Sequence, residues 1–171
     1  MVLLLFAAGP AASEDPGQPD PARPPSCREN PAYRAFDFWV GEWTVKNAAG
    51  KLVGSNSIGE RLGGCMLFES WKGAGGSTGE SINYYDPQAK IWKQVWVDGR
   101  GGNITLAGNF EAPAMTLTGE HVYPDGRREA IRGTWTLLDD GRVRQLFEQS
   151  KDEGKSWYTW FDGYYERSGG E

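Results

Sequence analysis

The sequence has few of the side chains that most often carry metal and nucleophilic chemistry. Its 171 residues contain one histidine, His121, and two cysteines, Cys27 and Cys65. A zinc or copper site would therefore lack enough soft ligands, and we expect no metal and no cofactor. We identify no catalytic motif. The following hydroxyls lie in no nucleophile-elbow context: Ser57, Ser70, Ser81 and Thr105.

The chain also lacks an excess of basic charge and a long apolar run. Its formal net charge is -5, with 24% charged and 39% hydrophobic residues. This balance indicates one globular domain and gives no sign of a nucleic-acid or anionic-membrane partner. The oligomeric state stays open.

The most apolar stretch, residues 2–8 (VLLLFAA), is too short to span a bilayer. Together with the small residues that follow, it has the composition of a secretory signal peptide, here without a basic n-region. We interpret residues 1–12 as a truncated signal peptide and expect an exported protein, periplasmic or secreted. A disordered apolar tail is the alternative, and we expect no lipid anchor at Cys27.

Residues 13–30 form the predicted linker, because five prolines and acidic residues dominate positions 13–26 and nothing there can pack. An exported protein with an even cysteine count usually pairs its cysteines. Cys27 and Cys65 are the only intramolecular choice for a disulfide. Two free thiols are preferred only if the export prediction fails.

The rest of the chain alternates short strand-like runs with turn signals such as Asp125-Gly126 and Asp140-Gly141, without a helical apolar period. We assign residues 31–167 to one all-β domain, with a short helix near Asn30 to Phe36. Ten strands are predicted: 38–46, 51–62, 65–72, 79–86, 91–98, 103–110, 114–123, 127–138, 142–150 and 157–166.

Ten antiparallel strands joined by short hairpins must protect their edges. An antiparallel up-and-down barrel closed on itself does so most simply, and a two-sheet sandwich is the alternative. The first strand is expected in residues 36–45 (FDFWVGEWTV), where Trp39, Gly41, Trp43 and Val45 share one face at period two. Eight tryptophans favour a barrel filled partly by large aromatic side chains.

The motif Gly41-Glu42-Trp43 resembles the G-x-W signature of lipocalins and calycins. Residues 31–167 resemble a bacterial family of exported calycin-like proteins known only as a domain of unknown function, through segments such as FDFWVGEW (36–43), SINYYD (81–86) and FDGYY (161–165). The resemblance implies a lipocalin-like barrel but brings no substrate or catalytic residue. It also implies that an arginine of the last strand covers the first-strand tryptophan, and Arg167 is the nearest candidate.

Residues 150–157 (SKDEGKSW) match the Asp-box pattern S-x-D-x-G-x-S/T-W. In that pattern the aspartate ties down a hairpin turn and the tryptophan packs beneath it. Sialidase propellers repeat the motif in each blade, but no second full copy occurs here, so we interpret it as structural.

Strand parity suggests which side chains point inward, provided that the register does not slip by one residue. If Trp43, Trp71 and Trp96 face inward, indoles, phenols, amides and one carboxylate share the interior. Such a lining indicates either a small wet ligand cavity or a satisfied hydrogen-bond network in a solid barrel. The predicted ligand-binding residues are Glu69, Trp71, Asn83, Tyr85, Trp92, Gln94, Trp96, His121 and Gln145.

We therefore expect an exported barrel that binds a small organic ligand of unknown identity. One alternative is a barrel enzyme of the hydratase, isomerase or cyclase kind, in which burial raises the pKa of Glu69 so that it acts as acid and base. Another is a structural or partner-binding envelope protein. Calycin-like barrels that carry haem bind its iron through an axial histidine. His121 is therefore either such a haem ligand or a histidine that packs in the fold or lies on its surface.

Overall fold

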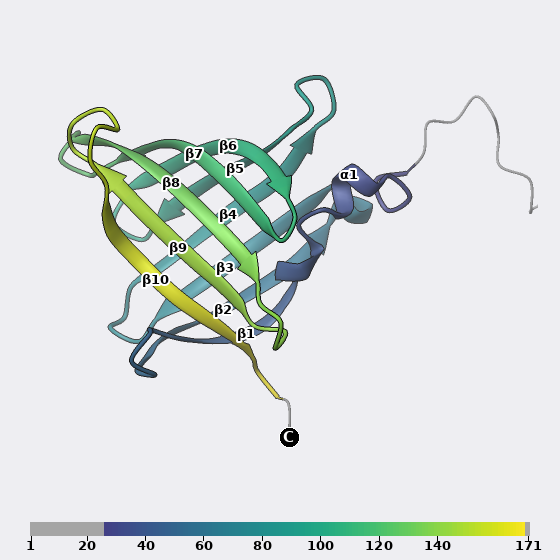
Figure 1. The fold of residues 1–171 in the computed structure, drawn as a ribbon, viewed down its shortest axis with the longest axis horizontal. Helices are drawn as coiled ribbons and strands as arrows, with labels where there is room; N and C mark the ends of the chain where they lie inside the picture. Colours follow the sequence, from purple (N-terminus) through teal and green to yellow (C-terminus); the bar gives the residue numbers. More distant parts are fainter. Residues whose placement is uncertain (1–25, 170–171) are drawn as a thin grey trace, which may run out of the picture.

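The computed structural model describes residues 26–169, which form a closed barrel of ten antiparallel strands (Figure 1). The predicted signal peptide and residues 13–25 of the predicted linker lie outside this range. The strands are β1 (Gly41–Lys46), β2 (Leu52–Arg61), β3 (Met66–Gly73), β4 (Thr78–Asp86), β5 (Ile91–Asp98), β6 (Asn103–Glu111), β7 (Ala114–Val122), β8 (Arg128–Leu137), β9 (Val143–Ser150) and β10 (Tyr158–Arg167).

Each strand pairs with the next one along the chain, and β1 closes the barrel by pairing with β10. The predicted all-β up-and-down barrel is confirmed, and the two-sheet sandwich is not the fold. Apart from the start of β1, every predicted strand boundary agrees with the observed one to within one residue. Closure leaves none of the ten strands with an unpaired edge.

Side chains alternate between the interior and the outer surface, as in any barrel of this kind. Along β8, for example, Glu129, Ile131, Gly133 and Trp135 are buried at every second position. Across the β8–β9 hairpin, the inward-facing Trp135 pairs with Gln145 of β9. The observed strand register therefore agrees with the alternation from which the inward-facing side chains were predicted.

A short segment before β1 forms a plug that closes one end of the barrel (Figure 1). It consists of α1 (Pro31–Arg34), which confirms the predicted short helix, and the 3-10 helix η1 (Asp37–Trp39). Phe36 and Trp39 are fully buried, their ring centroids lie 5.0 Å apart, and both rings contact Trp135. No helix in residues 26–169 is long and apolar enough to cross a membrane.

The start of β1 corrects the prediction. A strand was expected from Phe38, but the chain is helical through Trp39 and β1 begins at Gly41. Trp39 nevertheless is buried, as the period-two pattern required. The pattern was misleading because a buried plug residue and a buried strand residue look alike in the sequence.

Trp43 lies where the plug meets the strands, and only 1% of it is exposed. Its Nε1 donates to the carbonyl oxygen of Trp39 at 2.8 Å. The guanidinium carbon of Arg167 lies 4.3 Å from the centroid of the Trp43 ring, so the expected covering arginine is present. A Cβ at Gly41 would lie 2.1 Å from Arg167 Nη1, which explains the glycine at this position.

A disulfide ties the plug to the barrel wall. Cys27 is bonded to Cys65, which follows the 3-10 helix η2 (Leu62–Gly64) between β2 and β3, and the predicted pairing is confirmed. Close by, Arg34 Nη2 donates to Glu60 Oε1 at 2.6 Å. Covalent and ionic contacts therefore hold the plug from outside, while aromatic packing holds it from inside.

The Asp-box forms the turn between β9 and β10. Asp152 accepts hydrogen bonds from the hydroxyls of Ser150 (2.7 Å) and Ser156 (2.6 Å) and from the Ser156 backbone. Trp157 Nε1 donates to the carbonyl oxygen of Gly154 at 3.0 Å. The bonds from Ser156 are the main reason that the pKa of Asp152 falls to about 2. The motif is structural, as predicted.

Candidate functional site

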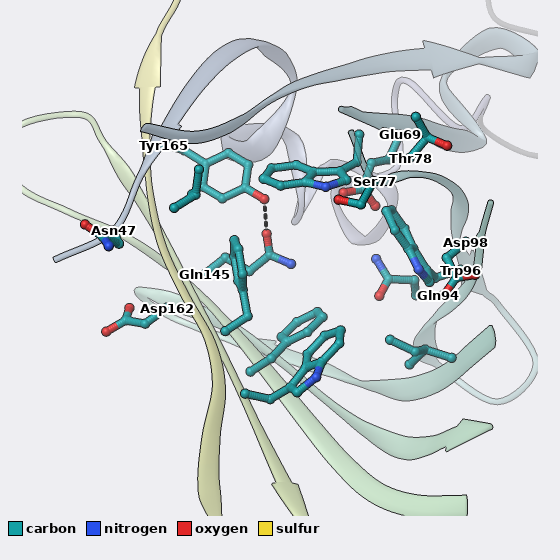
Figure 2. A pocket seen from close by; sticks show the side chains of 16 residues that line it. Asn47, Glu69, Ser77, Thr78, Gln94, Trp96, Asp98, Gln145, Asp162 and Tyr165 are labelled. Atoms are coloured by element: carbon teal, nitrogen blue, oxygen red, sulfur yellow. Dashed lines mark hydrogen bonds between the residues drawn. The ribbon is translucent and has the colours of Figure 1, made fainter. Parts of the chain in front are cut away.

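A pocket of about 500 Å³ lies inside the barrel, and Figure 2 shows the side chains that line it. Asn47, Ser77 and Thr78 are among them and lie at hairpin turns of the end opposite the plug, where the pocket opens. We call this the open end; it carries the β1–β2, β3–β4, β5–β6, β7–β8 and β9–β10 hairpin turns. The volume is in the range of small-molecule sites. The lining residues are Asn47, Val53, Glu69, Trp71, Ser77, Thr78, Gln94, Trp96, Asp98, Ile104, Gln145, Phe147, Trp160, Phe161, Asp162 and Tyr165.

Aromatic rings make a large part of the pocket wall. Trp71 meets Phe161 edge to face, with ring centroids 5.8 Å apart. Phe161 in turn contacts Phe147 at 6.5 Å, and Phe147 is stacked with Trp160 at 6.0 Å. Trp96 of β5 supplies a further ring (Figure 2). Four of these five rings form one continuous surface, which begins on β3 and continues over β10 and β9.

A β-bulge in β10 explains how two consecutive residues reach the same pocket. The register of β10 against β9 shifts between Thr159 and Phe161, so Trp160 is the extra residue. A bulge interrupts strict alternation and redirects side chains. Trp160 and Phe161 therefore both line the pocket, although a regular strand would turn them to opposite faces.

The floor of the pocket is a buried polar network centred on Glu69 of β3. Asn56 Nδ2 donates to Glu69 Oε1 at 2.7 Å, and Ser81 Oγ donates to Glu69 Oε2 at 2.6 Å. Only 3% of Glu69 is exposed, and no basic side chain pairs with it among residues 26–169. Burial raises the pKa of Glu69 to about 7, and the two hydrogen bonds oppose this shift only in part.

The network extends from Ser81 to Gln94 across two neighbouring strands. Asn83 Nδ2 donates to Ser81 Oγ at 2.8 Å, and Gln94 Nε2 donates to Asn83 Oδ1 at 2.7 Å. Every donor along this chain therefore points toward Glu69. Because the Gln94 nitrogen is engaged by Asn83, its amide oxygen remains available to the pocket.

A second branch begins at Tyr165. Its hydroxyl accepts from Asn56 Nδ2 at 3.3 Å and donates to Gln145 Oε1. Burial, together with the nearby Glu69, raises the pKa of Tyr165 well above its usual value, so the phenol stays protonated. The Gln145 oxygen is thus occupied and its amide nitrogen remains available. Figure 2 shows Gln94 and Gln145 extending toward the middle of the pocket.

The predicted site residues divide into two groups. Glu69, Trp71, Gln94, Trp96 and Gln145 line the pocket. The remaining predicted site residues lie elsewhere in the barrel: Asn83, Tyr85, Trp92 and His121.

Tyr85 and Trp92 face inward, but at the plugged end. Trp92 Nε1 donates to the carbonyl oxygen of Ala32 at 3.1 Å, and Tyr85 packs edge to face on Tyr33 at 5.2 Å. Asn83 is fully buried between Ser81 and Gln94 and acts inside the network. Parity gives the face of a strand on which a residue lies but not its height along the barrel axis.

His121 lies beside the pocket in a separate polar cluster at the open end. Its Nδ1 is 2.6 Å from Gln149 Nε2, and its ring stacks on Tyr123 with centroids 3.9 Å apart. Gln149 Oε1 accepts from the hydroxyls of Tyr123 and Tyr158, so its nitrogen is the donor to His121. Burial lowers the pKa of His121, which favours the neutral imidazole. This is a packed, hydrogen-bonded histidine.

Several pocket residues escaped the prediction. Extending period two along β9 from Gln145, and along β10 from Tyr165, would have found Phe147 and Phe161. Only the bulge brings in Trp160, and no signal in the sequence marks it. Residues 75–79 (GGSTG) match G-x-S-x-G by letter, but Ser77 lies in a β-hairpin rather than at a strand-to-helix turn.

Within residues 26–169, no group of three histidine, cysteine, aspartate or glutamate side chains is placed to hold a metal ion. Comparison with models of protein families and with curated proteins finds no match to the chain, so the pocket has to be interpreted from its own geometry.

Proposed function

We propose that the barrel binds a small organic molecule in the pocket at its open end. The observation that carries the proposal is a cavity of about 500 Å³ with aromatic walls over a buried polar floor, closed on the opposite side by the plug. Small-molecule sites combine mainly apolar walls with a few fixed polar groups in this way.

The polar floor also supports a preference among ligands. The network leaves the amide oxygen of Gln94 and the amide nitrogen of Gln145 available. A ligand with one donor and one acceptor would pair with both, and a ligand without them would leave buried amide atoms unpaired. Such mismatches cost about 1 to 3 kcal/mol each.

Fluorescence of the neutral probe N-phenyl-1-naphthylamine tests the proposal. We expect saturable enhancement on titration with the protein and displacement by the true ligand. Val53→Trp should weaken binding because Val53 lines the pocket and the larger ring occupies part of it. Val95→Trp is the matched control, since Val95 lies on the outer surface of β5. Equal binding by wild type and Val53→Trp would place the probe elsewhere and reject the proposal.

Acid and base chemistry on a bound molecule is a second candidate function. It is favoured by Glu69, which lines the pocket and has a pKa of about 7, close to the pH at which general acid and base catalysis is most efficient. Glu69→Gln should then leave binding within about tenfold and reduce turnover by about a hundredfold or more. Mass spectrometry of a metabolite mixture incubated with each protein measures both; unchanged composition with wild type favours the carrier.

The Cys27–Cys65 disulfide supports an oxidising location, so our proposal places the protein in the periplasm or outside the cell. Fractionation of the host cell, with thiol labelling before and after reduction, tests this. Recovery of reduced protein from the cytoplasmic fraction would contradict it.

A further inference from the structure

The pocket wall is built from rings that lie on glycines. A Cβ at Gly79 would lie 2.1, 2.6 and 2.7 Å from three adjoining atoms of the Trp96 ring, so the ring sits over this backbone position and not beyond it. A Cβ at Gly54 would likewise lie 2.6 Å from the Trp71 ring. The Trp96 and Trp71 rings therefore pack directly on the backbone of the neighbouring strand and line the lumen.

The same arrangement recurs on the other side of the pocket. A Cβ added at Gly133 would lie 2.2 Å from the Phe147 ring, and a Cβ added at Gly163 would lie 2.6 Å from the Phe161 ring. The face of an aromatic ring carries the negative end of its quadrupole. A cation in the lumen is therefore attracted by each ring that presents its face to it.

The ionisable groups of the pocket have the same sign. Among residues 26–169, those that line the pocket include no lysine, arginine or histidine, but they include Glu69, Asp98 and Asp162. Asp162 is paired with Arg144, whose Nε and Nη2 donate to it at 2.9 and 3.0 Å. In the described part of the chain, Glu69 has only neutral partners, Asn56 and Ser81.

We propose that the ligand of this pocket is an organic cation, an amine or quaternary ammonium attached to an apolar body, held between the aromatic faces above Glu69. The inference rests on the proposed ligand-binding function and deepens it. An anionic ligand such as a fatty acid would face carboxylates and ring faces without a counter-charge. A neutral ligand would gain the apolar contacts alone.

The test compares two ligands of equal shape. Benzyltrimethylammonium carries a permanent positive charge, and neopentylbenzene is its uncharged carbon isostere. Both are titrated into the full chain at pH 8, with tryptophan fluorescence and ligand-observed NMR as readouts. We expect the cation to bind at least about tenfold more tightly, a difference of about 1.4 kcal/mol. Phenylacetate should bind more weakly than either.

Two variants test the physical origin of the preference. Glu69→Gln keeps the side-chain shape and should weaken binding of the cation about tenfold while leaving the isostere within about twofold. Trp96→Leu removes one ring face and should also weaken the cation more than the isostere. Glu148→Gln is the matched control, because this carboxylate pairs with Arg132 on the outside of the barrel. It should change neither affinity.

The outcomes separate the two proposals. If the isostere binds as tightly as the cation, the organic-cation inference is wrong while the ligand-binding function stands. If both bind but Glu69→Gln and Glu148→Gln behave alike, the pocket charge has no role and the inference again fails. If wild type binds neither these ligands nor the neutral naphthylamine probe, the ligand-binding function itself is rejected.

Discussion

The two ends of this barrel use the same residue types for different purposes. At the plugged end, Phe36, Trp39 and Trp135 pack ring against ring and are fully buried. At the open end, Trp96 lies on a glycine, and Trp160 is 43% exposed. The plugged end is a core, and the open end is a lined space.

The difference shows that the surroundings of an aromatic side chain decide its role. A ring covered on both faces contributes burial, which is worth several kcal/mol for a tryptophan. A ring with one face on the backbone and the other toward a cavity contributes less to stability and keeps a face for a ligand. We therefore expect substitutions at the plugged end to affect unfolding and those at the open end to affect binding.

The largest effect is expected at the plugged end. Trp43→Ala should lower the free energy of unfolding by about 3 to 5 kcal/mol, as large-to-small changes of buried aromatic residues do. The substitution also removes the surface beneath Arg167 and the hydrogen bond to Trp39. Urea denaturation measures the change. A Trp43→Ala protein of unchanged stability that has lost ligand binding would reverse the contrast between the ends.

The disulfide tests whether the plug needs its covalent attachment. Cys27 and Cys65 are separated by 38 positions, and closing such a loop in the unfolded chain stabilises the fold by about 4 kcal/mol on the chain-entropy argument. Replacing both by alanine should lower the melting temperature, with ligand affinity of the folded protein unchanged. Two reactive thiols in the denatured, unreduced wild type would show that the bond does not form in solution.

Most of the fold could be predicted because it is a local property of the sequence. Alternation and turn residues such as Asp140-Gly141 mark each hairpin, and closure follows from the need to protect edges. Of the plug, α1 was predicted, but η1 was missed because Trp39 is buried like a strand residue although it lies in a 3-10 helix. The hydrophobic pattern of a sequence indicates which residues are buried, but over a few residues it does not distinguish a helix from a strand.

The site was less predictable because it depends on position along the barrel axis. Trp92 and Trp96 lie on the same face of β5, yet one meets the plug and the other the pocket. Their heights follow from strand tilt and stagger, which a single sequence does not specify. The bulge at Trp160 is likewise a tertiary feature. The cavity and the hydrogen-bond network, first considered as alternatives, occur together as wall and floor.

A smaller effect, with a defined sign, is expected from pH. Because burial raises the pKa of Glu69 from 4.5 to about 7, the folded state binds a proton that the unfolded state releases between these values. The contribution of this proton to the free energy of unfolding is fully present below pH 4.5 and is lost as pH rises through 7, a change of about 3 kcal/mol. Glu69→Gln should remove this pH dependence. Parallel stability profiles of wild type and variant between pH 4.5 and 7.5 would contradict the buried, uncompensated carboxyl.

The smallest effects on stability are expected in the polar network, where Asn83 lies in the middle and Gln94 at the end. Asn83 both donates to Ser81 and accepts from Gln94, so Asn83→Leu leaves two partners unpaired in the interior and should cost about 2 to 3 kcal/mol. Gln94→Leu breaks only one of these bonds, at the pocket surface, and should cost about 1 kcal/mol. Urea denaturation of the two variants compares these costs directly.

Binding should rank the same two variants in the opposite order. Gln94→Leu removes an amide oxygen that faces the pocket, so a ligand with a hydrogen-bond donor should lose about tenfold in affinity, whereas binding of neopentylbenzene, which has no donor, should change little. Folded Asn83→Leu should keep most of its affinity, because Asn83 lies behind the pocket surface. If Asn83→Leu instead loses the ligand at full stability, Asn83 contacts the ligand directly and the division between network and pocket surface is wrong.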